Sequence, residues 1–114
     1  MKDILQDLNG AFENNKRLAI MSALVVNDYM DFNGLKDLLD PLQITDGNLA
    51  SHLKYLEAAK YIEVEKSFIG KKPNTKYRAT KEGRQAFEQH LEALEKLLHS
   101  AGALTPEKPM KKKQ

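Results

Sequence analysis

The sequence contains no cysteine among its 114 residues. Without cysteine the chain forms no disulfide, binds no metal through thiolates and has no cysteine redox switch. Long apolar runs are also missing, since no stretch approaches the roughly 20 residues of a membrane-spanning helix. The N-terminal Met1-Lys2-Asp3-Ile4 lacks the apolar centre of a signal peptide. We therefore expect a cytoplasmic protein that does not contact a membrane.

Catalytic signatures are absent as well. The sequence has no glycine-rich phosphate-binding loop, no serine or cysteine nucleophile signature and no pair of carboxylates beside a histidine at the end of a strand. The candidate metal ligands are His90, His99 and the neighbouring Glu88, Glu92 and Glu95, but the two histidines are nine residues apart and point to opposite sides of one helix. The sequence thus predicts no enzyme, no metal site and no cofactor.

What is present is a globular composition with an uneven distribution of charge. Hydrophobic residues make up 41% and charged residues 30%, and the length fits one domain. The net charge is only +2, but residues 45–84 hold nine basic and five acidic residues, whereas residues 1–44 hold four and seven. Because the surplus of positive charge lies in the middle of the chain, a polyanionic partner is indicated there.

The middle segment begins with an amphipathic helix, predicted over residues 45–59. Leu49, Leu53 and Leu56 recur at i, i+4 and i+7, which gives one buried face. Thr45 is suited to the N-cap position. The opposite face carries side chains that can hydrogen-bond to base edges or phosphates, namely Asn48, Ser51, His52, Lys54 and Tyr55. Structural roles are the alternative to DNA contact for two of these residues: His52 would cap or pack, and Tyr55 would lie at the edge of the core.

A β-hairpin is predicted after this helix. Residues 62–69 alternate with a period of two, residues 70–74 are turn residues, and residues 75–79 form a second strand. The segment from residue 66 to residue 78 contains five basic residues and no acidic one: Lys66, Lys71, Lys72, Lys76 and Arg78. Like charges gain nothing from one another inside a folded loop, so this cluster indicates an external polyanion.

These segments resemble a known family. Asn48-Leu49-Ala50-Ser51-His52-Leu53-Lys54-Tyr55-Leu56-Glu57, then Tyr61-Ile62-Glu63-Val64, then Thr75-Lys76-Tyr77-Arg78-Ala79-Thr80-Lys81-Glu82-Gly83-Arg84, are similar to winged-helix regulators of the MarR and ArsR type. The resemblance covers about residues 15–87 and implies a winged helix-turn-helix of the α+β class, mainly α with a small β-hairpin. Lys60 departs from the family, which usually has glycine in the turn after the recognition helix. A left-handed conformation is costly for lysine, so the local turn is open to a different geometry.

Four further elements are predicted before the central helix. They are helices over residues 3–12 and 15–27, an extended piece at residues 29–32 beside the hairpin, and a short helix at residues 34–39. We expect Phe32 to be buried and Asn33 to cap the short helix, which positions the recognition helix. Pro41 disfavours helix in the residue before it and so ends this element.

The last predicted helix covers residues 80–100 and carries a long apolar stripe with the spacing of a coiled-coil seam. A small domain has little core left to cover such a stripe, so we expect dimerisation through the N- and C-terminal helices. The expected dimerisation residues are Leu5, Leu8, Phe12, Phe87, Leu91, Leu94 and Leu98. Alternatively, the stripe folds back on its own domain. The organisation is then a domain over residues 1–100, with its core at residues 15–87, and a flexible basic tail at residues 101–114.

The sequence therefore predicts a homodimeric, sequence-specific regulator of transcription that binds double-stranded DNA at a pseudo-palindromic site. The expected DNA-binding residues are Thr45, Asn48, Ser51, His52, Lys54 and Tyr55 on the helix, and Lys71, Lys72, Asn74, Lys76 and Arg78 on the wing. The alternative is a winged-helix module for protein–protein interaction, since the same scaffold hosts both functions. MarR-type relatives often bind small effectors, but the sequence alone reveals no polar pocket.

Overall fold

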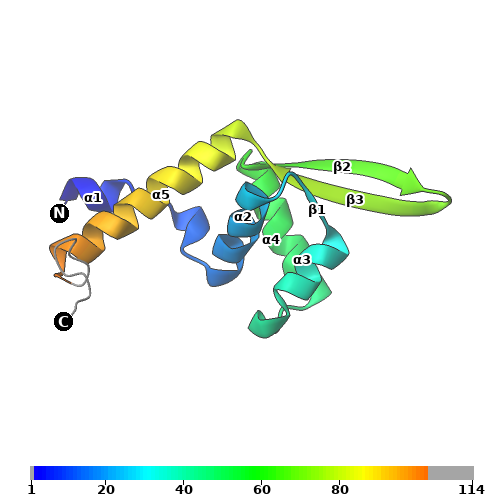
Figure 1. Cartoon of the computed structure of the whole chain (residues 1–114), viewed down its shortest axis with the longest axis horizontal. Coiled ribbons are helices and arrows are strands. Elements are labelled where there is room, and N and C mark those ends of the chain that lie inside the picture. Colours follow the sequence, from blue (N-terminus) through cyan, green and yellow to red (C-terminus); the bar gives the residue numbers. More distant parts are fainter. Residues whose placement is uncertain (1, 103–114) are drawn as a thin grey trace, which may run out of the picture.

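The computed structural model describes residues 2–102, which form a body of helices and a small three-stranded antiparallel sheet. In chain order the elements are α1 (Lys2–Gln6), the 3-10 helix η1 (Gly10–Phe12), α2 (Asn15–Val26), β1 (Met30–Asp31), α3 (Phe32–Leu38), the 3-10 helix η2 (Asp40–Leu42), α4 (Asp46–Ala58), β2 (Ile62–Ile69), β3 (Lys72–Ala79) and α5 (Lys81–Ser100). The molecule is elongated: the β2–β3 hairpin projects from one end of the helical body, and α5 extends with α1 towards the other (Figure 1). This arrangement confirms the predicted α+β class with a projecting wing.

The core lies between α2 and the helices around it. Its fully buried side chains are Phe12, Ile20, Met21, Leu24, Leu35, Leu39, Leu49 and Leu56. Burial of each such side chain contributes about 1.5–3 kcal/mol to folding. Three of these residues, Ile20, Met21 and Leu24, lie on α2, so α2 is the central helix against which α4 and the start of α5 pack.

The N-terminal segment differs from its prediction. A single helix over residues 3–12 is wrong, because α1 ends at Gln6 and a separate 3-10 helix follows. Asn9 causes this break: its side chain accepts a hydrogen bond from the Ala11 amide, and its own amide donates to Nδ1 of His90 at 2.9 Å. A residue that caps a new helix and binds another element in this way cannot continue the first helix.

The start of α3 also differs from its prediction. Asn33 is not the cap; Asp31 is, since its carboxylate accepts a hydrogen bond from the Gly34 amide at 2.7 Å. Phe32 is consequently the first residue of α3 and only half-buried, whereas a buried strand residue was expected. The extended piece beside the hairpin is confirmed, because Met30 and Asp31 pair with Tyr77 and Lys76.

The sheet has the order β1-β3-β2 and is antiparallel throughout. Ile69 pairs with Lys72, so the hairpin turn consists of Gly70 and Lys71 alone, and the predicted five-residue loop is too long. Gly70 adopts a φ of 64°, which two-residue hairpin turns of the primed types require at their first central position. Pro73 is tolerated within β3 because β1 pairs with this strand only further along.

The turn after α4 keeps the left-handed geometry in spite of Lys60. The lysine adopts a φ of 67°, its amide donates to the Glu57 carbonyl, and the Tyr61 amide donates to the Leu56 carbonyl at 3.0 Å. This pair of bonds is a Schellman motif. The geometry that the sequence left open is therefore the left-handed one, and the chain carries the conformational cost of lysine here.

The apolar stripe of α5 is divided between the domain's own core and solvent. Phe12 and Phe87 retain only 1% and 5% of their surface, and their rings meet edge to face with centroids 5.3 Å apart. Their assignment as dimerisation residues is wrong, because they are buried in the domain that carries them. Further along, Leu91 and Leu98 are exposed, and so is Leu5 on α1.

Within residues 2–102, no helix combines the length and the apolar character needed to cross a bilayer. Most of the predicted basic tail lies outside the described residues, and only Ala101 and Gly102 follow α5.

Candidate nucleic-acid interface

The recognition helix α4 presents its polar face to solvent. Leu49, Leu53 and Leu56 are buried on one side, as the periodicity predicts. On the other side, side chains with hydrogen-bonding groups are exposed: Thr45, Asn48, Ser51 and Lys54. The Thr45 hydroxyl accepts a hydrogen bond from the Asn48 amide at 3.1 Å, so the predicted N-cap is confirmed. These side chains are free to reach a partner along the length of the helix.

An ion pair holds α4 against the positioning helix. Nζ of Lys36 lies 2.7 Å from the Asp46 carboxylate in the first turn of α4. This hydrogen bond, with the attraction of nearby carboxylates, raises the pKa of Lys36 above its ordinary value despite an opposing effect of desolvation. The contact joins the two helices of the helix-turn-helix and neutralises the acidic group nearest to the N-terminus of α4.

His52 and Tyr55 are held by Arg17, a residue that the sequence analysis missed. Arg17 Nη1 lies 3.2 Å from Nδ1 of His52, and its guanidinium carbon lies 4.1 Å from the centre of the Tyr55 ring. Its Nε donates to the Ala11 carbonyl at 2.7 Å, which anchors the guanidinium. No sequence signal links Arg17 to α4, because the two lie on different helices and His52 follows 35 residues later.

Arg17 also determines the hydrogen-bonding character of His52. Arginine is only a donor, so Nδ1 of His52 accepts and the neutral ring carries its proton on Nε2. Burial lowers the pKa of His52, and the charges of Arg17 and Lys16 lower it further. At neutral pH, His52 is therefore neutral and offers a partner a single ring N–H donor. The face of the Tyr55 ring is occupied by the Arg17 guanidinium, so Tyr55 offers a partner the edge of its ring.

The wing carries its positive charge largely without internal partners. Lys66, Lys71 and Lys72 are exposed, and within the described chain no carboxylate oxygen lies within 4.0 Å of their amino groups. Arg78 is 4.0 Å from Glu65, in a pair open to solvent, and Nζ of Lys76 lies 4.3 Å from the centre of the Tyr29 ring. An exposed pair of this kind contributes little, so it leaves the charge of Arg78 available.

A notch of about 290 Å³ separates α4 from the hairpin. Lys54 lines it from α4 and Lys66 from β2, while Tyr77 lies at the side of β3. Burial raises the pKa of Tyr77, and the nearby Glu57 raises it further, so the phenol stays protonated. A negatively charged strand lying across the notch would meet two lysines and one carboxylate. Asn74 is half-buried and faces a smaller pocket that Asp31 and Asn33 share.

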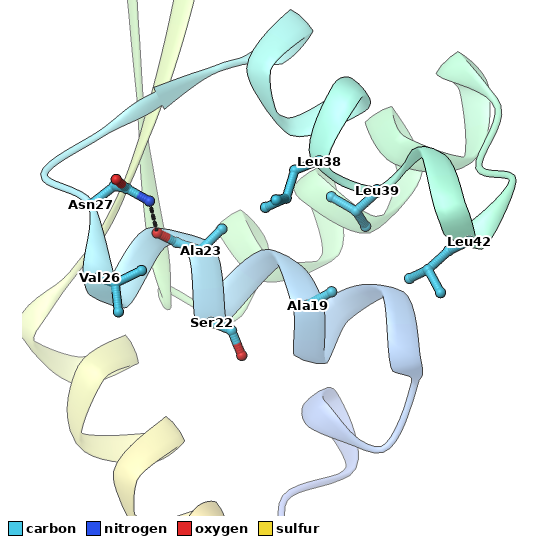
Figure 2. Close-up of a pocket in the computed structure, with 8 residues that line it drawn as sticks. All are labelled: Ala19, Ser22, Ala23, Val26, Asn27, Leu38, Leu39 and Leu42. Carbon is cyan, nitrogen blue, oxygen red and sulfur yellow. Dashed lines mark hydrogen bonds between the residues drawn. The ribbon is translucent and has the colours of Figure 1, made fainter.

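A second, larger depression lies between α2 and the α3–η2 segment (Figure 2). Its volume is about 630 Å³, which is in the range of small-molecule sites, about 300–1,000 Å³. It is lined by Ala19, Ser22, Ala23, Val26, Asn27, Leu38, Leu39 and Leu42. The Asn27 side-chain amide already donates to the Ala23 carbonyl at 2.8 Å, and none of the described residues that line the groove is charged. It therefore offers no counter-charge to an ionised ligand.

The candidate metal ligands are not brought together. The described residues contain no group of three or more histidine, aspartate or glutamate side chains placed to hold a metal. His90 is buried against Phe12, with ring centroids 5.6 Å apart, and its Nδ1 accepts from the Asn9 amide. Burial lowers its pKa, an effect that Glu13 partly offsets. His90 is thus a hydrogen-bonded core residue.

Comparison with known proteins agrees with this geometry. Residues 16–98 match the family model described as winged helix DNA-binding domain. The chain is 38% identical over 80 residues to an uncharacterized protein of Methanocaldococcus jannaschii, an alignment that covers 70% of this chain and 84% of that protein.

Solved structures show the same architecture. A transcriptional regulator homologue from Pyrococcus horikoshii OT3 superposes with a TM-score of 0.74 at 27% identity, over 88% of this chain and 94% of that one. A regulator of the MarR family from Enterococcus faecalis V583 superposes with a TM-score of 0.61 at 24% identity, over 89% and 81% of the two chains. The second similarity is one of fold.

Proposed function

This chain belongs to the family of winged helix DNA-binding domains, and we propose that it is a sequence-specific regulator of transcription that binds double-stranded DNA as a homodimer. The matched family is defined by DNA binding and not by catalysis, in agreement with the prediction that the chain is not an enzyme. The observation that carries the proposal is the pairing of an exposed polar face on α4 with a wing on which Lys66, Lys71 and Lys72 have no carboxylate partner among the described residues.

The recognition helix supplies the contacts to bases. Asn48, Ser51 and His52 lie on its exposed or half-exposed face, and their amide, hydroxyl and ring N–H groups match donors and acceptors at the edges of bases in the major groove. Thr45, Lys54 and Tyr55 contact the phosphates beside them. Phosphate contacts fix the register of the helix, while the base contacts supply specificity.

The wing supplies sequence-independent affinity. Lys71 and Lys72 at the tip, and Asn74, Lys76 and Arg78 along β3, contact the flanking backbone or minor groove. Each phosphate that a cation neutralises releases condensed counterions, which favours binding and makes it depend on salt. The amino group of Lys76 makes a cation–π contact with the Tyr29 ring in the free protein. The net contribution of Lys76 to DNA affinity is therefore reduced by the free energy of breaking this contact.

Dimerisation uses the part of the apolar stripe that the domain leaves uncovered. Leu5, Leu91 and Leu98 each expose between 44% and 50% of their surface. The half-buried Leu94 also lies on α5, and the half-buried Leu8 follows the end of α1. A two-fold axis through this surface would place two α4 helices in successive major grooves, about 34 Å apart, which implies a pseudo-palindromic operator.

The wing assignment predicts the behaviour of the variant Lys71→Ala/Lys72→Ala. Loss of two phosphate contacts should weaken binding to every duplex and reduce the slope of log affinity against log salt by about two. Mobility shifts with duplexes of several sequences, over a series of salt concentrations, measure both quantities.

The matched control is Lys2→Ala/Lys96→Ala, which removes the same charge from α1 and α5 at the opposite end of the molecule. Its salt slope should equal that of the unaltered chain. Unchanged affinity of the Lys71→Ala/Lys72→Ala variant at low salt would show that the wing does not contact DNA. Absence of any association of the unaltered chain with duplex would favour a protein-interaction module instead.

A further inference from the structure

The tip of the wing carries two large apolar side chains in solvent. Phe68 and Ile69 expose 72% and 68% of their surface, more than the uncovered leucines of α5. They lie at the end of the hairpin, far from the helical body (Figure 1). A side chain of this size contributes about 1.5–3 kcal/mol when buried, so its exposure on a projecting tip forgoes that stabilisation.

The strand register determines on which face of the hairpin each of these side chains lies. Phe68 pairs with Pro73, so both side chains lie on the same face of the hairpin. By alternation that face also carries Lys66 and Thr75, which line the notch between the hairpin and α4. Phe68 and Pro73 therefore extend outward the face that the wing turns towards the recognition helix. Ile69 pairs with Lys72 on the other face, next to the turn.

The two strands of the hairpin stay paired up to the residues next to the turn. The Ile69–Lys72 pair closes directly onto the two-residue turn, and Gly70 contributes no side chain to it. A Cβ added at Gly70 would meet no atom within 4 Å, so no part of residues 2–102 covers the turn at this position. Paired strands lie about 4.8 Å apart, whereas a helix with its side chains is about 10–12 Å across. The tip of the hairpin therefore fits the minor groove, which is about 6 Å wide, better than a helix does.

The charges around the tip identify the partner that fits it. Phe68 and Ile69, on opposite faces of the tip, are flanked along the hairpin by Lys66, Lys71 and Lys72, and the segment from residue 66 to residue 78 contains no acidic residue. A base step in duplex DNA has the same arrangement, with an apolar stacked interior lying between two rows of phosphates. The tip thus complements duplex DNA in both polarity and charge.

We propose that the wing tip is an apolar wedge that enters the minor groove, where Phe68, backed by Pro73 and with Ile69 beside it, partly unstacks a base step and bends the DNA. This inference rests on the proposed function and adds a mechanical activity to it. Wedges of this kind kink the duplex by about 20–90° towards the major groove. Because pyrimidine–purine steps unstack most easily, the position beneath the tip favours TA or CA/TG without a hydrogen bond to a base.

The test compares DNA bending by the unaltered chain and by Phe68→Ala/Ile69→Ala. The probe is a mixed-sequence duplex of about 150 base pairs, one persistence length, whose closure into circles by DNA ligase is slow unless a protein bends it. Both proteins are added at concentrations that give equal occupancy in a mobility shift. The unaltered chain should raise the yield of circles, and the variant should lose this gain while keeping its salt slope, since neither residue is charged.

Two further variants make the result specific. Phe68→Leu retains a large apolar side chain and should restore the yield of circles. Val26→Ala removes an exposed apolar side chain from α2, outside the hairpin, and should leave bending unchanged. All positions are exposed, so circular dichroism should show the same unfolding temperature for every protein.

Four outcomes would overturn the inference. If the unaltered chain binds the duplex but does not raise the yield of circles, or if the double variant raises it equally, the wedge is wrong and the proposed function stands. If the chain does not bind duplex at all, both fail. Sedimentation with phosphatidylserine vesicles that depends on Phe68, with circle formation unaffected by the substitution, would assign the tip to a lipid surface.

Discussion

At the scale of single residues, Gly83 shows how one missing side chain allows two elements to meet. A Cβ built at Gly83 would lie 2.0 Å from the Tyr61 carbonyl oxygen and 2.8 Å from its carbonyl carbon. The same oxygen accepts a hydrogen bond from the Thr80 amide at 3.0 Å, so it cannot move away without cost. The first turn of α5 therefore packs directly on the backbone that leads into the wing.

Gly83→Ala should lower the free energy of unfolding by about 1–3 kcal/mol, because α5 or the start of β2 must shift to accommodate the methyl group. Urea denaturation followed by circular dichroism measures the change. Gly47→Ala on α4 is the control: an added Cβ meets no atom within 4 Å there, so this substitution should raise stability by about 0.5–1 kcal/mol through helix propensity. Equal effects at both positions would show that the contact with Tyr61 does not constrain the fold.

At the scale of elements, the end of the recognition helix combines a strong hydrogen-bonding motif with an unsuitable residue. The Schellman bonds at Glu57 and Leu56 stop α4 and direct the chain into β2. The Thr80 hydroxyl, which caps α5, also donates to the Lys60 carbonyl at 2.7 Å. The turn thus joins α4, the wing and α5, which is why its left-handed geometry is kept although residue 60 is lysine.

Lys60→Gly should raise the free energy of unfolding by about 1 kcal/mol, since glycine adopts positive φ without the steric cost that an L side chain incurs. Lys60→Ala is the matched control, because alanine incurs the same cost as lysine, and its stability should stay close to that of the unaltered chain. Thermal and urea unfolding of the three proteins measure the difference. A gain with alanine equal to that with glycine would mean that the lysine side chain, and not its backbone conformation, is unfavourable.

At the scale of the whole molecule, the elongated shape separates two surfaces. The wing projects at one end with α4 near its base, and α1 and the C-terminal part of α5 lie at the other end (Figure 1). The uncovered leucines Leu5, Leu91 and Leu98 belong to these last two helices. The side chain of Gln89 donates to Asp7 at 3.1 Å, which holds α1 beside α5 and keeps Leu5 next to the α5 stripe. A partner can therefore cover the leucines without approaching the surface proposed for DNA.

Leu91→Glu/Leu98→Glu should convert the proposed dimer into a monomer, because two charges in an apolar seam cannot be buried without partners. Sedimentation equilibrium measures the mass, and selection of bound sites from random DNA measures the consequence. The unaltered chain should recover a two-fold motif and the variant only a half-site, at lower affinity.

The control is Val26→Glu/Leu38→Glu, which places the same charges on exposed apolar positions in the groove of Figure 2. It should remain dimeric. A monomeric mass for the unaltered chain at concentrations at which it binds DNA would contradict the dimer.

The site was predictable where its signals are local. The spacing of Leu49, Leu53 and Leu56 oriented α4, Thr45 marked its start, and the run of lysines without an acid marked the wing. Each of these signals depends on neighbours within a few positions, where backbone periodicity and hydrogen-bonding rules act directly. The α+β class followed from the same local information.

Only the tertiary structure decided which distant side chains meet. It brought Arg17 to His52 and Tyr55, buried Phe87 and His90 in the domain's own core, and left Phe68 in solvent although its strand alternates like a half-buried one. Sequence periodicity defines the faces of a helix or strand but not the length over which another element covers them. That length depends on how the side-chain volumes of separate elements fill one core, and the wing simply extends beyond it.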